Sequence, residues 1–406
     1  MASSSSPAPL WVVLGRVALV QHDSVKDPGD LSVKLSLPPR ASTLTVPMSV
    51  HPKPGYDDTD RHPYAIAAGD AGVLLHASRW PFVGFDLDRD PPGILLVARD
   101  FLAAAGPGKA LATSVVRVPD RARTYQPGIS SVRNVGLVSL PGSGGAEYVV
   151  AELRIAAGSD DDGRATLLTF RSGTDAWVQK DLSCPSMSGR RWMWSSHDVI
   201  AHDGKLWWVN LVWGLLGCDP FADEPVLHHV AFQETYPVVG HTAEDVVSRR
   251  MVRVSQGKVR FVEVARGRAH RPEETLVVVW TLVFGPSGFT FWKQQSATSL
   301  GRIWASDSYR ATGLSATVPV LALLHPSNPD VVYFFLEKYL EMYLFGVSVS
   351  RSTVVHFVHN PFDLVKVVSG HRRPPPISWR HVLAWELPAS LANGKANASN
   401  DQLKHG

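Results

Sequence analysis

Carboxylates and histidines are the side chains of this 406-residue chain whose types and spacing could support hydrolysis. Two His-Asp pairs, at residues 197–198 and 202–203, each offer a base next to a carboxylate that could orient it. Neither pair has a candidate nucleophile or oxyanion donor beside it in the sequence. A polar loop that leads into a strand at Leu206 is therefore the simpler interpretation, and we assign no catalytic residue.

Sequence patterns that hold nucleotides or metals are missing from the chain. Residues 108–109 (Gly-Lys) are followed by Ala110 where a phosphate-binding P-loop requires Ser or Thr. The pair His228-His229 is adjacent in sequence, and neighbours on a strand point to opposite faces, which does not suit one metal ion. Residues 160–162 (Asp-Asp-Asp) lack the spacing and the closing Glu of a calcium loop. We therefore predict no metal and no cofactor.

Two groups of cations and aromatic side chains could instead form a binding surface. One lies at residues 190–194, and the other is segment 249–271, which has eight Lys or Arg residues against Glu263 alone. Alternation along a strand would place several of these cations on one sheet face, although a solvated outer strand explains them as well. Tryptophans near arginines suit an interaction surface but equally suit a core. The candidate binding surface comprises Arg190, Arg191, Trp192, Trp194, Arg249, Arg253 and Arg260.

Composition restricts the class of protein. Forty Lys plus Arg against 37 Asp plus Glu give a net charge of +3, which is too small to indicate a nucleic-acid partner. The longest uncharged apolar stretch, residues 276–292, is shorter than a spanning helix needs and contains a Gly-Pro-Ser-Gly turn, so we expect no membrane segment. Two cysteines, Cys184 and Cys218, are expected to be reduced, with a single disulfide between them as the alternative.

The first residues indicate where the protein works. Residues 1–9 are Ser-rich and lack Lys and Arg, and the apolar run 10–20 is broken by Arg16, which does not fit a secretory signal. We therefore expect the protein in the cytoplasm and/or the nucleus. The acid-poor, Ser-rich start also resembles a plastid transit peptide, which leaves the plastid as an alternative location.

The elements that must position these side chains are predicted to be short β-strands. The 32 Gly and 30 Pro residues are spread along the chain, and between them lie short runs rich in Val, Ile, Phe, Tyr and Trp. Only residues 100–105 and 337–344 have a helical pattern, and both segments are short. Strands without long amphipathic helices between them indicate an all-β fold.

A turn residue followed by a short apolar strand recurs along the chain. The five occurrences begin at Gly72, Gly145, Gly204, Gly257 and Asp330, at intervals of 53 to 73 residues. Propeller repeats of about 40 to 50 residues, lengthened by loop insertions, would produce such intervals. We therefore predict a β-propeller-like closed ring of five or six blades, with two β domains split near residue 240 as the alternative.

Pairing between the two ends of the chain would close such a ring. The apolar run at residues 11–20 could pair with residues 381–387, which would remove exposed strand edges. We therefore predict a single domain over residues 10–388, with disordered tails at residues 1–9 and 389–406.

Residues 206–227 carry the most specific pattern in the sequence. They begin with the strand Leu-Trp-Trp-Val-Asn-Leu, continue through a Gly-Leu-Leu turn and end in an Asp-x-Pro-x-Leu segment. This segment resembles the signature of a plant family expanded in grasses, the domain of unknown function 1618. Asn210 stands where the family usually has Asp. The positions singled out in the motif are Trp207, Trp208, Asp219, Asp223 and Pro225.

The resemblance implies more about fold than about function. The family has no established activity, and its members look like β-propeller relatives of plant F-box-associated repeats. Its Asp and Pro positions are expected to fix a turn between two blade strands, since both residue types are common in turns. The first 70 residues are Pro-rich and strand-like rather than Leu-rich and helical, so we expect no F-box.

Two hypotheses about function follow. The leading one is a non-enzymatic interaction or scaffold protein whose loops bind a protein or peptide partner, because the repeat pattern is present and every catalytic motif we sought is missing. The alternative is a propeller-type hydrolase of a small molecule or glycan. Its carboxylates, at the mouth of a channel, would be drawn from Asp198, Asp203, Asp219 and Asp223.

Overall fold

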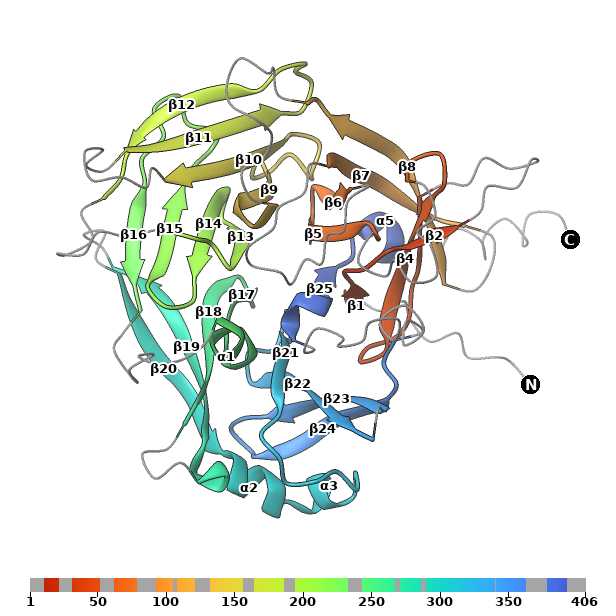
Figure 1. Cartoon of the computed structure of the whole chain (residues 1–406), viewed down its shortest axis with the longest axis vertical. Helices are drawn as coiled ribbons and strands as arrows, with labels where there is room; N and C mark the ends of the chain where they lie inside the picture. Colours follow the sequence, from red (N-terminus) through yellow and green to blue (C-terminus); the bar gives the residue numbers. More distant parts are fainter. Residues whose placement is uncertain are drawn as a thin grey trace, which may run out of the picture.

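The computed structural model is nearly all β, as the sequence predicts (Figure 1). It describes residues 11–21, 31–51, 62–78, 93–104, 108–120, 132–155, 164–185, 194–232, 243–266, 271–285, 290–339, 341–362 and 378–392. The predicted N-terminal tail at residues 1–9 lies outside the described residues, as does residue 393 onward of the predicted C-terminal tail. Residues 389–392 of that tail form a short helix, α5 (Ala389–Ala392).

Four sheets of four strands each follow one another in the described part of the chain, and each is an antiparallel meander. The first contains β9 (Val135–Ser139), β10 (Tyr148–Ile155), β11 (Arg164–Arg171) and β12 (Val178–Ser183). The second contains β13 (Asp198–His202), β14 (Lys205–Asn210), β15 (Gly214–Cys218) and β16 (His228–Ala231). The third contains β17 (Arg250–Ser255), β18 (Lys258–Ala265), β19 (Leu276–Phe284) and β20 (Thr290–Ser299). The fourth contains β21 (Val320–Leu324), β22 (Val331–Lys338), β23 (Glu341–Ser348) and β24 (Thr353–His359).

The other described strands form one nine-stranded sheet that joins the two ends of the chain. Its order is β25-β1-β4-β3-β8-β7-β6-β5, with β2 paired to β4. Strand β1 pairs antiparallel with β25, with Trp11 opposite Glu386, which confirms the predicted pairing of the chain ends. Strands β25 and β5, at the two ends of this order, contact each other, so the sheet is nearly closed like a barrel. The strands are β1 (Trp11–Gly15), β2 (Leu19–Gln21), β3 (Ser32–Lys34), β4 (Ala41–Pro47), β5 (Tyr64–Gly69), β6 (Gly72–Ala77), β7 (Ile94–Ala103), β8 (Lys109–Val118) and β25 (Val382–Glu386).

Six strands lie around a common centre, one from each four-stranded sheet and two, β5 and β25, from the nine-stranded sheet (Figure 1). Contacts connect β5 to β9, β9 to β13, β13 to β17, β17 to β21, β21 to β25, and β25 back to β5. We call these six the inner strands. One hydrophobic cluster also contains residues on both sides of position 240, from Ile200 to Trp379. Within the residues it describes, the structure therefore shows no division into two β domains near residue 240.

The five predicted repeat starts occupy equivalent places in the structure. In each sheet concerned, an inner strand is followed by a second strand, namely β6, β10, β14, β18 or β22. The repeat start lies at the beginning of that second strand or in the connection before it, at Gly72, Gly145, Gly204, Gly257 and Asp330 respectively. The turns Asp203-Gly204 and Gln256-Gly257 have positive φ at both central residues, between 51° and 70°. Such two-residue turns match the twist of an antiparallel pair, and glycine adopts positive φ without strain.

Large side chains fill the space between neighbouring sheets. Trp207 and Trp208 are adjacent on β14, so they point to opposite faces of their sheet. Trp208 packs in a cluster with Val149 of the preceding sheet, whereas Trp207 packs in a cluster with Val252 of the following sheet. Burial on both faces explains why these strands are continuous apolar runs rather than alternating ones.

The two predicted helices are wrong. Most of residues 100–105 belong to β7, where Phe101 pairs with Ala112 and packs on Trp385 with ring centroids 5.2 Å apart. Residues 337–344 span the hairpin between β22 and β23, in which Lys338 pairs with Glu341. Strand pairing and aromatic burial outweigh the local helical preference here. The other helices in the described residues are short and lie elsewhere: α1 (Ala243–Arg249), α2 (Leu300–Ala305), α3 (Asp307–Arg310), and the 3-10 turns η3 (Val132–Asn134), η4 (Pro272–Glu274) and η5 (Trp379–His381).

Candidate functional site

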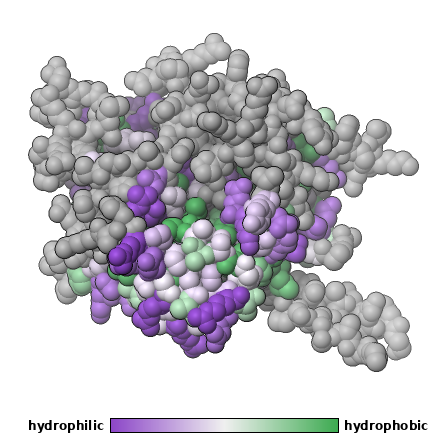
Figure 2. All heavy atoms as spheres, turned by 60° about the horizontal axis from the view of Figure 1, so that its bottom comes forward, coloured by the Kyte–Doolittle hydropathy of each residue, from purple (hydrophilic) through white to green (hydrophobic). Residues whose placement is uncertain are grey.

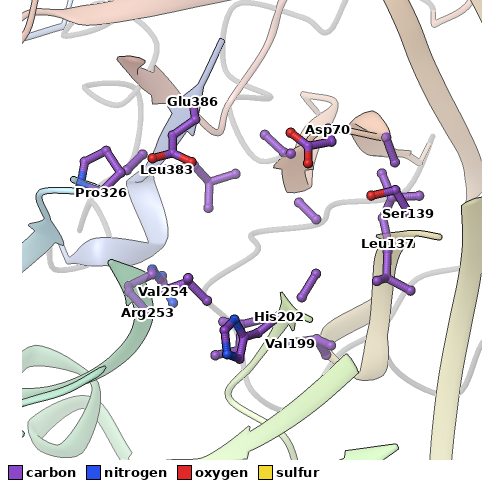
Figure 3. Close-up of a pocket in the computed structure, with 18 of the residues that line it drawn as sticks. Asp70, Leu137, Ser139, Val199, His202, Arg253, Val254, Pro326, Leu383 and Glu386 are labelled. Atoms are coloured by element: carbon purple, nitrogen blue, oxygen red, sulfur yellow. The ribbon is translucent and has the colours of Figure 1, made fainter. Parts of the chain in front are cut away.

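A cavity of about 430 Å³ lies among the inner strands (Figure 3). Each of the six inner strands contributes residues to its wall. Asp198, at the start of β13, is buried, whereas Asp203 just beyond the end of β13 and Glu386 at the end of β25 are exposed. The cavity therefore has a buried floor and an open mouth, and its volume falls within the range of small-ligand sites.

The floor is organised around the carboxylate of Asp198. Arg253 donates from Nη1 to Asp198 Oδ2 at 2.6 Å, and Arg16 Nη2 lies 3.5 Å from the same oxygen. Asp198 Oδ1 accepts the backbone N–H of Val199 at 3.0 Å. Arg16 also donates from Nη1 to the Tyr64 hydroxyl at 3.0 Å, and that hydroxyl donates to the carbonyl of Arg380 at 2.7 Å. This network holds the two guanidinium groups beside one carboxylate.

Trp379 contacts the two arginines of the floor and also Arg380, which does not line the cavity. The guanidinium carbons of Arg253, Arg380 and Arg16 lie 4.7, 5.5 and 5.8 Å from its ring centroid, within the range of cation–π attraction. The indole itself is fixed by a 3.1 Å hydrogen bond from Nε1 to the carbonyl of Arg250. Trp379 is fully buried, so these contacts lie in a desolvated environment.

The groups around the floor titrate as expected in a buried, positively charged environment. Burial, reinforced by Arg380 and Arg133, lowers the pKa of His197 to about 3. Burial likewise lowers the pKa of His381 to about 4, with Arg16 and Arg380 acting in the same direction. Burial and the neighbouring Arg133 lower the pKa of Arg380 to about 10, which still leaves this guanidinium charged at neutral pH. The two imidazoles are therefore neutral next to charged arginines.

The mouth carries carboxylates instead. Asp70 and Glu386 lie on one side of the cavity and His202 and Arg253 on the opposite side (Figure 3). Partial burial and the negative charge of Asp70 raise the pKa of Glu386. Asp203 is a third carboxylate at the mouth, in the exposed turn after β13. The cavity is thus cationic at its floor and anionic at its mouth.

The structure separates the four carboxylates singled out in the sequence. Asp198 and Asp203 line the cavity, the first on its floor and the second at its mouth. Asp219 and Asp223 belong to the connection between β15 and β16 and are not part of the cavity wall. Two further carboxylates line the cavity and were not identified from the sequence. Asp70 lies just beyond the end of β5, and Glu386 lies at the end of β25.

The candidate binding surface is distributed over several places. Arg190, Arg191 and Trp192 lie outside the described residues. Arg253 belongs to the cavity floor, and Arg260, opposite it in register, is only 3% exposed and donates to Thr281 and Gln295. These two arginines are interior because β17 and β18 are covered by neighbouring sheets.

The two other described members are partly buried. Arg249 lies 3.5 Å from Asp245 on the preceding turn of α1. Trp194 packs against the cluster that contains Trp208, and its Nε1 donates to Ser196 Oγ at 3.1 Å. The structure therefore does not bring the described residues of this set to one exposed face.

The outer surface has exposed apolar side chains but mixes them with polar ones. Figure 2 shows the face that carries the lower elements of Figure 1, on which hydrophilic residues surround paler and hydrophobic ones. Val355 and Phe357 of β24 are 43% and 41% exposed, with His356 between them. Isolated exposed apolar residues are normal on protein surfaces, so we base no site on them.

The signature residues of segment 206–227 have structural contacts. Asp219 Oδ1 accepts the backbone N–H of Phe221 at 2.9 Å, a turn-forming bond between β15 and β16. The carbonyl of Asp223 accepts Lys180 Nζ at 3.0 Å, and Pro225 is half-buried in the same connection. Asn210 accepts the backbone N–H groups of Val212 and Trp213 and donates to the carbonyl of Ser195 at 2.9 Å. The Asn210 amide thus both donates and accepts hydrogen bonds, whereas an ionised aspartate could only accept them.

The sequence contained one unused signal for the floor. Arg16 interrupts the apolar run at residues 10–20, and an arginine inside such a run must find partners when the strand is buried. Tyr64, Trp379 and Arg380 had no comparable signal, because their positions near Arg16 depend on long-range pairing: a bridge between Val17 and Tyr64, and the pairing of β1 with β25.

The thiols and the acidic and histidine side chains of the described residues show no second site. Both cysteines are free, and burial raises the pKa of the Cys218 thiol to about 12. The described side chains contain no cluster of three or more His, Cys, Asp or Glu residues with the spacing of a metal site. In the same residues, no helix is long and apolar enough to cross a membrane.

The solved structures and curated proteins give at most weak similarities to this chain. No curated protein matches the chain. Among solved structures, one of two prolyl endopeptidases aligns with 72% of this chain at 12% identity and a TM-score of 0.31, and the chain covers 34% of that protein. The GDP-Man-dependent mannosyltransferase MPT-1 from Leishmania mexicana aligns with 86% of this chain and 90% of its own length, at 10% identity and a TM-score of 0.25. Similarities this weak support no argument about activity.

A family comparison is more specific. Residues 208–333, from β14 to β22, match a family described as "Protein of unknown function (DUF1618)". The match begins within the signature segment 206–227 and extends through the third sheet. It supports membership of this chain in the DUF1618 family.

Proposed function

We propose that this chain is a six-bladed β-propeller of plant type that acts as a non-enzymatic interaction protein and receives a peptide segment of a protein partner in its central cavity. The cavity carries the proposal, because all six inner strands contribute to its wall and its mouth is open.

The sheet order supports six blades. Four blades correspond to the four-stranded sheets, and β5 to β8 make a fifth meander within the nine-stranded sheet. The sixth blade would combine β25 with β1, β4 and β3, so that both chain ends contribute to one sheet. Closing a propeller in this way protects the strand edges of the first and last blades.

The shape and chemistry of the cavity favour binding. Propeller-like rings place turns from successive blades around one opening, and here the turns after β5 and β13 provide Asp70 and Asp203. Charged groups at the mouth and floor would orient an entering segment, while backbone and aliphatic groups such as Ala68 and Val254 would contact its remainder. We place this activity in the cytoplasm or the nucleus, with the plastid as the alternative.

Selection from a displayed peptide library tests this proposal. Purified full-length chain should enrich a family of related peptides, and Ala201→Trp should weaken their binding at least about tenfold by filling the mouth. Ala305→Trp, on the exposed face of α2, is the matched control and should bind like the wild type. Failure to enrich any peptide family, or equal binding by both variants, would contradict a peptide site in the cavity.

A hydrolase remains the second candidate because of one observation at the mouth. Glu386 has a raised pKa, caused by partial burial and by the neighbouring carboxylate of Asp70. Two interacting carboxylates with different environments are the arrangement that glycoside hydrolysis uses for its acid and its base or nucleophile. In this version Asp70 and Glu386 replace the Asp219 and Asp223 of the sequence-based hypothesis.

Hydrolysis of chromogenic glycosides distinguishes the two candidates. Turnover that is lost in both Glu386→Gln and Asp70→Asn, with folding retained, would favour the hydrolase. Turnover that persists unchanged in both variants would come from a contaminant and would leave the binding function as the better account.

A further inference from the structure

The cavity floor holds more positive than negative charge. Arg16 and Arg253, which both line the cavity, share the carboxylate of Asp198. Arg380 does not line the cavity but stacks on Trp379, which both of these arginines also contact. Arg16 is 4% exposed, and the Arg253 side chain is 12% exposed. Burying an excess of like charge is unfavourable unless an opposite charge compensates it.

One nitrogen of Arg16 and one nitrogen of Arg253 have no acceptor among the described residues. Arg16 Nε and Arg253 Nη2 are buried and make no hydrogen bond within the part of the chain that the structure describes. Arg16 Nη1 and Nη2 face Tyr64 and Asp198, and Arg253 Nη1 donates to Asp198 and to the carbonyl of Val252. Stacking on Trp379 attracts the cations but provides no lone pair for these N–H groups. An oxygen anion would satisfy both the charge and the donors.

We propose that the floor of the cavity binds an anionic oxygen group, a carboxylate or a phosphate, carried by the peptide partner. Guanidinium groups suit this role because their planar N–H pairs match carboxylate and phosphate oxygens. Asp198 contacts both guanidinium groups through Oδ2, and its negative charge competes with the anion for them. The proposal deepens the proposed function and rests on it for the identity of the carrier.

The charge at the mouth adds a second requirement. Strand β13 runs from Asp198 on the floor to His202 at the mouth, which corresponds to about 13 Å of extended chain. Asp70, Asp203 and Glu386 would repel a uniformly acidic peptide at that level. The peptide that fits therefore enters with its anionic group first and has a Lys or Arg about three to four residues away.

Inorganic phosphate and acetate are the probes for the floor itself. Each should raise the melting temperature of the full chain in a saturable manner when ionic strength is kept constant with chloride, because ligands that bind only the folded state stabilise it. Calorimetric titration of the same salts gives the dissociation constants. Identical melting temperatures in phosphate, acetate and chloride would overturn the proposal.

Two substitutions should change anion affinity in opposite directions. Arg253→Gln should weaken phosphate binding at least about tenfold by removing one charged donor. Asp198→Asn should strengthen it about fivefold or more by removing the competing negative charge, a gain that loss of folding cannot imitate. Arg310→Gln, with a side chain 65% exposed on α3, is the matched control and should bind like the wild type. Weaker binding by the Asp198 variant would overturn the proposal.

Peptide arms separate this inference from the proposed function. An enriched peptide should bind less tightly when its carboxylate is amidated or its phosphate is removed, and excess inorganic phosphate should compete with it. If amidation weakens binding, the anion is a carboxylate. If dephosphorylation weakens binding, the anion is a phosphate. If peptides bind the cavity but ignore phosphate and Arg253→Gln, the anion site is refuted and the interaction function stands. If phosphate binds but no peptide does, the interaction function fails.

Discussion

Acidification is expected to destabilise this protein through three histidines that are neutral in the folded state, of which His76 and His381 are buried and His197 is partly buried. Burial lowers the pKa of His76 to about 4, with His51 acting in the same direction, and lowers that of His381 to about 4. Burial together with Arg380 and Arg133 lowers the pKa of His197 to about 3. An unfolded histidine has a pKa of about 6.5. Protons therefore bind the unfolded chain first as the pH falls.

The size and sign of the effect follow from linkage. Above pH 6.5 the histidines are neutral in both states, so their contribution to stability is fully present. Between about pH 6.5 and 4 the unfolded state binds more protons, and the free energy of unfolding falls as the pH falls. Near pH 5 each histidine contributes about 1.2–1.3 kcal/mol per pH unit, or about 3.7 kcal/mol per pH unit for the three. Between pH 6.5 and pH 4 the three histidines together remove about 8 kcal/mol, which is comparable to the whole stability of a domain, about 5–15 kcal/mol.

Urea unfolding at pH 7.5, 6.5, 5.5 and 5.0 measures this slope. His76→Gln should reduce the slope below pH 6 by about 1.2 kcal/mol per pH unit, whatever its effect on stability at pH 7.5. His228→Gln, on the exposed side of β16, is the matched control and should leave the slope unchanged. Equal slopes for the wild type and His76→Gln would refute the assignment of His76 as a buried neutral histidine.

Three further predictions concern packing and the signature segment, and all are measured by urea unfolding at pH 7.5. Trp385→Ala should cost about 3–5 kcal/mol, because the indole is fully buried on the strand that joins the chain ends; a cost near zero would contradict that packing. Gly217→Ala should cost about 1–3 kcal/mol, since its Cβ would lie 2.4 Å from the Trp207 ring, whereas Gly69→Ala, which meets no atom within 4 Å, should be nearly neutral. Asn210→Ala should cost about 1–3 kcal/mol by removing three hydrogen bonds, and Asn210→Asp should cost less, because it keeps the two bonds to Val212 and Trp213; the reverse order would refute these roles.

The fold class was accessible from the sequence because strand patterns and turn chemistry are local. Asp203-Gly204 and Gln256-Gly257 form turns with positive φ, which glycine favours, and the apolar runs between such turns are strands buried on both faces. The pairing of the chain ends was accessible for a different reason, namely that an apolar strand at each end requires a partner. Residues 100–105 were misread as a helix because only their distant partners on β8 make them a strand.

The candidate site was only partly accessible. Asp198 and Asp203 attracted attention through their neighbouring histidines, but the arginines that bind Asp198 come from positions 16 and 253. Their convergence depends on the closure between β1 and β25 and on contacts between sheets, neither of which is encoded by spacing. The basic segment 249–271 was misinterpreted for the same reason. Alternation along a strand shows which side chains share a sheet face, but it does not show whether that face is exposed or is covered by a neighbouring sheet.

The most direct test of the account is a crystal structure of the full chain with an enriched peptide. We expect the peptide in the cavity among the six inner strands, with its anionic group within hydrogen-bond distance of Arg16 and Arg253 and a basic residue near Asp70 or Glu386. A peptide bound along an outer strand such as β24, with the cavity filled only by solvent, would contradict the central claim.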